Sequence, residues 1–355
     1  MSIKKNIEEV FNKYVENENF SGVGFVRQGS EAIFHKAYGY AHRGFKIPNN
    51  LNTKFDTASI TKMFTAVSIL QLVDKGLVTL DHKVLDIIDI GESKISSEIT
   101  IYQLLTHTSG IADDADEEAG ESYEEIWKEK PNYSVKETVD YLAQFIYKEP
   151  KFAPGQGCSY NNCAFILLGL VIEKVTGKSY REYVKENIFD VIGMSNTGFY
   201  SMDEVVGNMA EHYASILDDE ENIIGYRKNI YSYPTIGSAD AGALTTPEDL
   251  DLFIRSLRDG NLLSKKSTEC LFKPKEFYKR YGKVTQYMGY GFQFFIRNDD
   301  EEIFYIQKDG INSGVSCVMN YYPQYDLTII IMSNQQANVW DLGWEVQEVI
   351  IGKII

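Results

Sequence analysis

Two segments in the middle of the chain are apolar on nearly every face of the helix that each predicts. The first covers residues 58–75 and is followed by Gly76, and the second covers 163–176 and is followed by Gly177. Glycine often ends a helix, because it adopts the left-handed conformation without strain. A helix without a polar face has to be buried on all sides. The chain therefore needs further layers of structure around both segments, and its 355 residues are enough to build them.

Both ends of the chain carry β-like runs that are separated by turn residues. At the N-terminal end, a helical segment over about 3–15 precedes two runs at 23–28 and 32–40. At the C-terminal end, a closing helix at 340–351 follows four runs rich in Ile, Val, Tyr and Phe. These four runs cover 290–296, 303–308, 315–322 and 327–333. The pattern predicts an antiparallel sheet built from both termini and flanked by the terminal helices.

Together these elements predict a single α/β domain of the α+β type over residues 1–355. We expect a sheet lobe from about 1–55 and 235–355, and an all-helical lobe from about 56–234. A cleft between two such lobes is the natural place for a binding site.

Composition and charge exclude several other classes of protein. Hydrophobic residues make up 44% of the chain and charged residues 24%, the usual mixture of a globular domain. The net charge of −16 argues against nucleic acid as a partner, because phosphate binding needs basic surface. No apolar run is long enough for a membrane span, and the first residues do not resemble a secretory signal. The four cysteines, at 158, 163, 270 and 317, lack the spacing of zinc ligands.

We therefore expect a cytoplasmic protein with reduced cysteines that acts on a small molecule or a short peptide. The sequence indicates no metal and no cofactor, and it predicts no particular oligomeric state. The segment 113–130 is dense in Asp and Glu, and two interpretations of it stand. It is either a solvated surface insert, as charge runs usually are, or an acidic rim near the cleft that attracts cationic substrates.

A serine followed three residues later by a lysine opens the first buried helix. Side chains three positions apart lie on one helix face, so Oγ of Ser59 and the amine of Lys62 can meet. The helix dipole stabilises an alkoxide in the first turn and, together with burial, disfavours a charged lysine. Ser59 is thus a candidate nucleophile and Lys62 its candidate base. The alternative is a structural lysine, and the same spacing recurs without a buried helix in Ser2 and Lys5.

Two further patterns carry groups that suit the same chemistry. Tyr160 and Asn162 precede the second buried helix. A tyrosine beside a lysine can shuttle protons, and the asparagine can orient that lysine or bind a substrate carbonyl. Lys308, Asp309 and Gly310 end a strand whose edge can offer a backbone N–H to an oxyanion, with glycine allowing close approach. Each pattern also fits a structural interpretation, as a helix N-cap and as a turn after a surface strand.

In this order, Ser-x-x-Lys, Tyr-x-Asn and Lys-x-Gly are the signature of the serine β-lactamase and penicillin-binding-protein superfamily. The flanking sequence resembles the class C β-lactamase-like group, which includes D-Ala-D-Ala carboxypeptidases, D-aminopeptidases and related esterases. The resembling stretches lie at 55–66, 104–111, 152–155, 160–162, 192–197 and 241–246. The resemblance implies the two-lobed β-lactamase/transpeptidase-like fold. His107, within the second stretch, is expected to be structural.

The resemblance also implies an acyl-enzyme mechanism without metal or cofactor. Ser59 would attack a carbonyl, while Lys62 and Tyr160 share the base and acid roles and Lys308 tunes Tyr160. The backbone N–H groups of residues 59 and 311 would form the oxyanion hole, and water would release the acyl group. The residues expected to bind substrate are Asn162, Asp309, Gly310 and Ile311.

Two departures from the family pattern bear on the substrate. Asp309 stands where lactamases of this group carry threonine; its carboxylate disfavours carboxylate-bearing substrates and, if it faces the cleft, favours an amine. Lys308 replaces the histidine of many related esterases and aminopeptidases, which points back to lactamases and carboxypeptidases. We predict a serine hydrolase of small esters or D-amino-acid peptides with only incidental β-lactam hydrolysis. The alternative is a penicillin-recognition-like sensor that is acylated without turnover.

Overall fold

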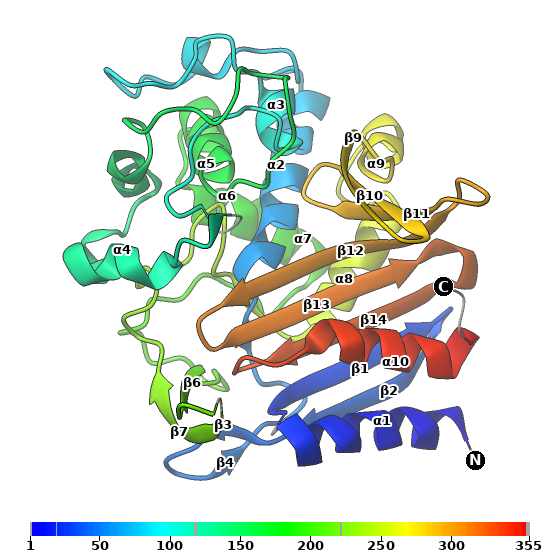
Figure 1. Cartoon of the computed structure of the whole chain (residues 1–355). Coiled ribbons are helices and arrows are strands. Elements are labelled where there is room, and N and C mark those ends of the chain that lie inside the picture. The colour runs from blue at the N-terminus through cyan, green and yellow to red at the C-terminus, as the bar shows by residue number, and fades with distance from the viewer. Residues whose placement is uncertain (1, 19, 117–118, 221, 353–355) are drawn as a thin grey trace.

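The structure is a computed structural model, which describes residues 2–18, 20–116, 119–220 and 222–352. An eight-stranded sheet has the strand order β2-β1-β14-β13-β12-β11-β10-β9 (Figure 1). Each neighbouring pair in this order is antiparallel. The two chain ends meet where β1 pairs with β14, with Gly22 opposite Ser333 and Gln28 opposite Leu327. The prediction of an antiparallel sheet built from both termini is confirmed.

The strands match the predicted runs to different degrees. Both β13 and β14 have the predicted bounds, whereas β12 continues four residues beyond its predicted end, to Asn312. The hairpin of β9 and β10 was not predicted. The strands of the large sheet are Gly22–Gln28 (β1), Glu31–Tyr38 (β2), Glu276–Tyr281 (β9), Val284–Met288 (β10), Gln293–Arg297 (β11), Ile303–Asn312 (β12), Val315–Tyr322 (β13) and Leu327–Ser333 (β14). The shorter strands pair as Tyr40–His42 (β3) with Ile47–Pro48 (β4), Phe55–Asp56 (β5) with Leu244–Thr245 (β8), and Tyr213–Leu217 (β6) with Ile223–Lys228 (β7).

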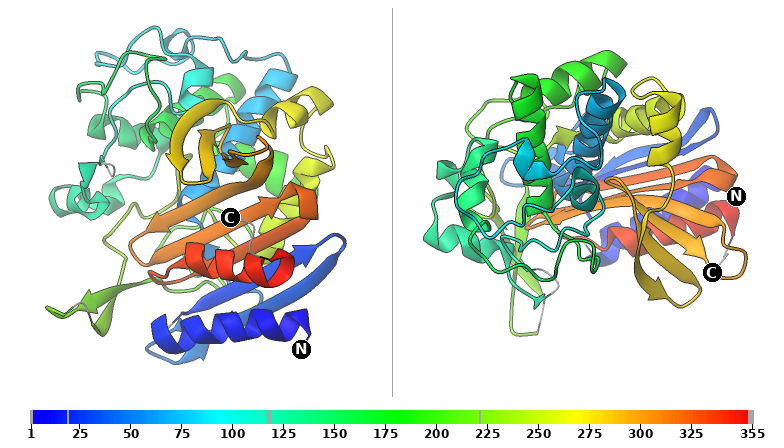
Figure 2. Two further views of the ribbon diagram at one scale, coloured as in Figure 1. Left: turned by 45° about the vertical axis from the view of Figure 1, so that its right-hand side comes forward. Right: turned by 90° about the horizontal axis from the view of Figure 1, so that it is seen from above.

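The two terminal helices cover one face of the large sheet, as the sequence predicts. These helices, α1 (Ile3–Glu18) and α10 (Val339–Ile351), lie side by side over the sheet (Figure 1; Figure 2). Phe11 of α1 stacks on Phe34 and on Tyr38 of β2, with ring centroids 5.1 and 5.4 Å apart. One of two hydrophobic cores fills the space between this helical layer and the sheet.

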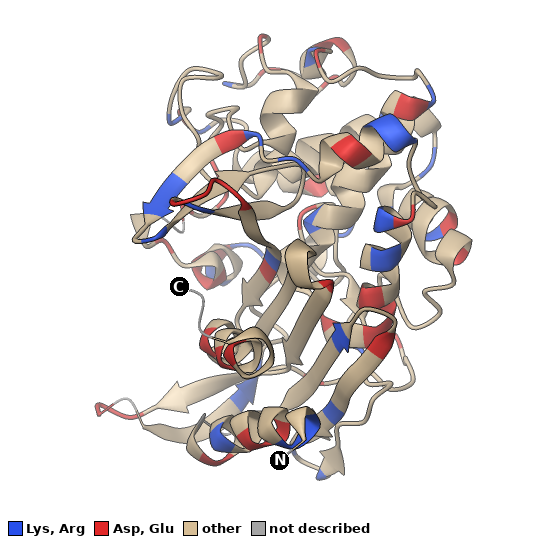
Figure 3. Cartoon of the chain, turned by 90° about the vertical axis from the view of Figure 1, so that its right-hand side faces the viewer, with Lys and Arg blue, Asp and Glu red and all other residues tan. Residues whose placement is uncertain are grey.

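The second and larger core lies on the opposite face, between the sheet and the remaining helices. Strands β13 and β14 contain no charged residue and are buried along their whole length. Charged residues lie mainly on helices, loops and outer strands (Figure 3). The helices of this layer are α2 (Lys62–Asp74), α3 (Ile101–Leu105), α4 (Tyr123–Glu129), α5 (Cys163–Thr176), α6 (Tyr180–Val184), α7 (Asp190–Ile192), α8 (Pro247–Arg258) and α9 (Lys265–Leu271). Shorter helical turns lie at Ala58–Thr61 (η1), Val84–Asp86, Asn132–Ser134, Thr138–Gln144, Lys185–Phe189 and Pro323–Tyr325.

Both segments predicted as fully buried helices are buried, with one correction. In α2 the residues from Lys62 to Leu72 are all buried, and α5 has the predicted bounds, with Gly177 at φ 70° directly after it. Residues 58–61, however, form a separate 3₁₀ turn, so Ser59 precedes α2 instead of lying in its first turn. None of the helices in the described part of the chain combines the length and the apolarity needed to cross a bilayer. The segment 56–234 is not all-helical as predicted, because the hairpin of β6 and β7 lies within it. The lobe boundaries near residues 55 and 235 stay a prediction.

Candidate active site

Ser59 lies in a tight turn that neighbouring segments hold on both sides. Ala58, directly before it, adopts the left-handed conformation at φ 42°, which is unusual for a residue other than glycine. The backbone N–H of Ala58 donates to the carboxylate of Asp56 at 2.7 Å. On the other side, the N–H and hydroxyl of Thr57 both donate to the carbonyl of Ala243, at 3.0 and 2.8 Å. These contacts stabilise a strained backbone that presents the serine.

Lys62 is fully buried, and its amine lies at the serine hydroxyl. The Nζ atom is 3.0 Å from Oγ of Ser59, 2.7 Å from Oδ1 of Asn162 and 2.9 Å from the carbonyl oxygen of Asp240. Residues three apart eclipse one another in a 3₁₀ turn, which explains the short contact with the serine. The two other acceptors orient the amine, so the predicted Ser59–Lys62 contact is present in the fold.

The ring of Tyr160 lies between two lysines. Its centroid is 5.0 Å from Nζ of Lys62 and 4.9 Å from Nζ of Lys308, and the Lys308 amine is 3.4 Å from the phenol oxygen. The imidazole of His107 stacks on the same ring at 4.6 Å. Nearby cations favour loss of the phenolic proton, so this arrangement suits a tyrosine that gives and takes protons. The three motifs thus meet in the fold, although they lie on the Ser59 turn, on the segment before α5 and on strand β12.

His107 packs beside Tyr160 as a neutral, buried side chain. Its Nδ1 accepts the backbone N–H of Asn161 at 3.1 Å, and its carbonyl accepts the N–H of Ser159 at 3.0 Å. Burial, and then the charges of Lys308 and Lys62, lower the pKa of His107 well below its ordinary value. The geometry is that of a structural histidine, in agreement with the sequence prediction.

The carboxylate of Asp309 points away from the serine. In β12, successive side chains alternate between the two faces of the sheet, so Asp309 lies on the face opposite Lys308. Its oxygens accept the indole N–H of Trp340 from α10 at 3.2 Å and the amide of Gln293 at 3.4 Å. The condition under which it would favour a substrate amine is therefore not met. A substrate-binding role for this side chain, predicted from its place in the motif, has no support in the geometry.

Gly310 lies directly against the turn that carries Ser59. A Cβ atom at this position would be 2.0 Å from the carbonyl oxygen of Thr57 and 3.0 Å from the backbone nitrogen of Ser59. Only glycine lets β12 approach the turn this closely. Ile311, next along the strand, has a side chain that is 48% exposed and lines the adjoining cavity.

We expect the substitution Gly310→Ala to lower kcat/KM by about a hundredfold or more, because β12 has to move away from Ser59. The matched control is Gly207→Ala, since a Cβ at Gly207 meets no atom within 4 Å. Both variants are compared by activity and by thermal melting. A Gly310→Ala protein that is folded and as active as the wild type would show that this close approach does not matter.

A cavity of about 700 Å³ extends from Ser59 and is lined by four acidic residues, of which only Glu124 belongs to the acidic segment 113–130. Glu124 and Glu211, which line it, pair with Arg227 and Lys228 of β7. The other two lining carboxyls, Asp56 and Asp240, are almost completely buried. Burial raises the pKa of each to about 6, although Lys62 opposes the rise for Asp240. One oxygen of Asp240 has no hydrogen-bond partner among the described residues.

We expect Asp240→Asn to stabilise the protein more strongly near pH 8 than near pH 5. The folded-state pKa of about 6 lies above the ordinary value of 3.8, so folding takes up a proton, and stability falls as pH rises through this interval. The difference between these two pKa values corresponds to about 3 kcal/mol in the free energy of unfolding at pH 8. Urea unfolding at both pH values measures it, with Glu129→Gln on the surface as control. Equal effects at the two pH values would contradict the prediction.

The acidic segment 113–130 does not behave as one solvated insert. Asp113 and Asp114 are only 6% exposed, which corrects the surface interpretation for these two. Glu121, Glu125 and Glu129 are exposed as expected, Glu124 lines the cavity, and residues 117–118 lie outside the described residues.

The two buried aspartates and Cys163 form a group whose side chains are close enough for metal binding. The chemistry of this group does not suit an ion. The oxygens of Asp113 accept backbone N–H groups at the start of α5, and burial raises the pKa of the Cys163 thiol well above its ordinary value. In the described part of the chain this group is a buried helix cap.

The comparison with known sequences follows the geometry of the site. A sequence model of the Beta-lactamase family matches residues 7–345, nearly the whole chain. The chain belongs to the Beta-lactamase family. The predicted resemblance and the predicted fold class are thereby confirmed.

Three known proteins are similar to this member of the Beta-lactamase family over much of its length. Penicillin-binding protein 4* of Bacillus subtilis (strain 168) is 27% identical over 350 residues, which cover 94% of this chain and 72% of that protein. Esterase EstB of Burkholderia gladioli is 30% identical over 209 residues, 56% of this chain and 52% of the esterase. The crystal structure of a penicillin binding protein from Bacillus halodurans has a TM-score of 0.88 and 31% identity, over 97% of this chain and 100% of that chain.

Sequence reasoning assigned no individual role to three acidic residues at the site of this Beta-lactamase family member. The carboxylates of Asp56 and Asp113 contact the Ser59 turn and Asn162, and the backbone carbonyl of Asp240 contacts Lys62. Asp56 could have been found from the sequence, because a carboxylate three residues before Ser59 in an apolar run is unusual. Asp113 and Asp240 are distant in sequence from the groups they contact, so no local pattern marks them.

Proposed function

We propose that the protein cleaves an ester or amide bond through an acyl-enzyme on Ser59. The family and its relatives support hydrolase chemistry in general, and the proposal adds the residues and the bond type. The observation that carries it is the 3.0 Å contact between Oγ of Ser59, which lines the cavity, and Nζ of the fully buried Lys62. A hydroxyl at this distance from an amine can lose its proton to that amine as it attacks.

In the proposed first step, Oγ of Ser59 bonds to the substrate carbonyl carbon while its proton passes to Nζ of Lys62. The carbonyl oxygen becomes negative, and the backbone N–H groups of Ser59 and Ile311 would stabilise it. As the leaving group departs, the set of Lys62, Tyr160 and Lys308 returns a proton to it. Water then attacks the acyl ester and restores the serine.

The orientation of Asp309 bears on the class of substrate. Because its carboxylate is bonded to Trp340 and Gln293 on the far side of β12, it does not repel a substrate carboxylate at the serine. The charge of Asp309 is therefore no reason to expect weak binding of β-lactams. With penicillin-binding proteins among its relatives, the chain is expected to be acylated by β-lactams as well as by esters.

Intact-protein mass spectrometry, with product release followed in parallel, tests the proposal. The wild type is incubated separately with a chromogenic cephalosporin, a short-chain aryl ester and a D-alanyl amide. Multiple turnover of any one supports the hydrolase. A single stoichiometric adduct without further product would instead support the sensor that is acylated without turnover. If a fluorophosphonate probe also leaves the protein unlabelled, Ser59 is not an active nucleophile and the proposal fails.

A further inference from the structure

The side chain of Asn162 is free to reach Lys62 because other residues cap the helix that Asn162 begins. Asparagine before a helix commonly accepts the helix's own first N–H groups. Here the side chain of Asn162 makes no such cap. The N–H groups of residues 162 and 163 donate to Asp113 at 2.9 and 3.0 Å, and that of Ala164 donates to Asn161 at 2.7 Å.

The same carboxylate also sets the orientation of the Asn162 amide. Its Oδ2 accepts Nδ2 of Asn162 at 3.3 Å, which leaves Oδ1 of that amide facing Nζ of Lys62 at 2.7 Å. A carboxylate accepts hydrogen bonds only, so the nitrogen side of the amide has to face Asp113. Both residues are 6% exposed, and in such surroundings the contacts are strong.

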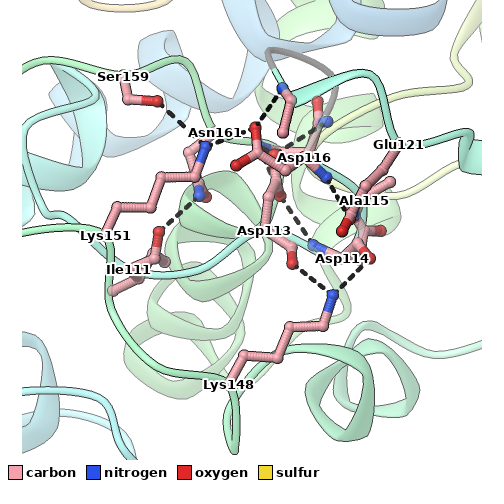
Figure 4. A network of polar contacts seen from close by, with 12 residues as sticks. Ile111, Asp113, Asp114, Ala115, Asp116, Glu121, Lys148, Lys151, Ser159 and Asn161 are labelled. Carbon is pink, nitrogen blue, oxygen red and sulfur yellow. Dashed lines mark hydrogen bonds and ion pairs between the residues drawn. The ribbon is translucent and has the colours of Figure 1, made fainter.

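The loop that carries Asp113 is fixed by contacts of its own. Lys148 donates to the carbonyl oxygens of Asp113 and Asp114 at 2.9 and 2.7 Å (Figure 4). The side chain of Asn161 donates to the carbonyl of Ile111 at 3.0 Å, and Lys151 pairs with the carboxylate of Asp116 at 2.8 Å (Figure 4). The carboxylate of Asp113 therefore has a defined position relative to the segment before α5.

We propose that Asp113 is a positioning residue of the active site, which holds the Asn162 amide with its oxygen toward Lys62. The inference rests on the proposed function, in which Lys62 takes the serine proton. Without the carboxylate, the amide can turn and present its N–H groups to the lysine. The amine then loses one of the acceptors that direct it to Oγ of Ser59.

Asp113→Asn tests the proposal, and Asp114→Asn is the matched control. Asp114 is equally buried and adjacent, and burial raises its pKa well above its ordinary value, so the amide closely resembles its protonated form. We expect Asp113→Asn to lower kcat for the aryl ester, and the rate of fluorophosphonate labelling, by about 10- to 100-fold with little change in KM. Asp114→Asn should stay within about twofold of the wild type.

A double-mutant cycle separates positioning from a purely structural role. If Asp113 acts through Asn162, the change Asp113→Asn has no further effect on kcat once Asn162→Ala is present. Full additivity, or an Asp113→Asn protein within about twofold of the wild type, would overturn the proposal. A wild type that neither labels nor turns over refutes the proposed function instead, and this is known before any variant is compared.

Near-UV circular dichroism establishes that the variants are folded before their rates are compared. Should Asp113→Asn not fold, Asp113→Ser provides a second test, because its single oxygen can accept a helix N–H but cannot also hold the amide. The same loss in kcat is expected. If neither variant folds while Asp114→Asn does, Asp113 is a structural helix cap and the positioning role is refuted.

Discussion

Replacing Ser59 by alanine is expected to lower turnover by more than about a thousandfold, because the variant has no oxygen to form the acyl-enzyme. The change removes one atom from a side chain whose hydroxyl contacts Nζ of Lys62. The folded structure should persist, since the turn is held by backbone contacts of its neighbours. The measurement is steady-state hydrolysis of the substrate that the wild type turns over, together with intact mass after fluorophosphonate treatment.

The chain contains its own control for this experiment. Ser2 and Lys5 repeat the Ser-x-x-Lys spacing, but Ser2 is exposed at the start of the chain. Ser2→Ala should therefore leave turnover and labelling unchanged. Near-normal turnover by Ser59→Ala would reject this serine as the nucleophile, whatever the family of the chain.

Replacing Lys62 by methionine is expected to reduce the rate of acylation by about 10²- to 10⁴-fold, the usual contribution of a general base. Methionine is similar in length and apolar, so it fills the buried space. It leaves Oδ1 of Asn162 and the carbonyl of Asp240 without their amine donor, so thermal stability is expected to fall, and the variants are compared well below their melting temperatures. Rapid labelling kinetics with the fluorophosphonate probe measure acylation directly, without dependence on the deacylation step.

Two further variants make the result specific. Lys62→Arg should not restore activity, because the guanidinium stays protonated and cannot take the serine proton. Lys75→Met, at the far end of the same helix, should have no effect, since the Lys75 amine contacts the hydroxyl of Tyr183. If the acylation rate of Lys62→Met is within about tenfold of the wild-type rate, Lys62 is not the base. Tyr160, whose ring also lies near Lys308, would then be the candidate base.

Much of the site could be predicted because its key residues occur in short motifs. A spacing of three residues brings Ser59 and Lys62 together in any helical turn, so their contact does not depend on the rest of the fold. The buried helices at 62–74 and 163–176 were predictable from apolar residues on every face. The strands at 315–322 and 327–333 could be located because turn residues bound each run.

Other features depend on contacts between segments that are far apart in the chain. The direction of Asp309 is set by the alternation of β12 and by α10, which supplies Trp340. A dense run of acidic residues indicates solvent exposure on average, yet Asp113 is buried because α5 offers it unpaired N–H groups. Asp240 is placed at Lys62 by its backbone carbonyl, a group that every residue carries.

Local spacing and apolar patterning were thus enough to identify the family signature, the candidate nucleophile and its candidate base, and the assembly of one sheet from both chain ends. These properties depend on the spacing of residues along the chain and on the hydrophobicity of their side chains, and the sequence gives both directly. Only the tertiary structure decided that Asp309 faces away from Ser59, and that Asp113 and Asp240 face the Asn162–Lys62 pair. The hydrogen bonds that place these residues join positions up to 178 apart in the chain, and they form only after the helices and the sheet have packed.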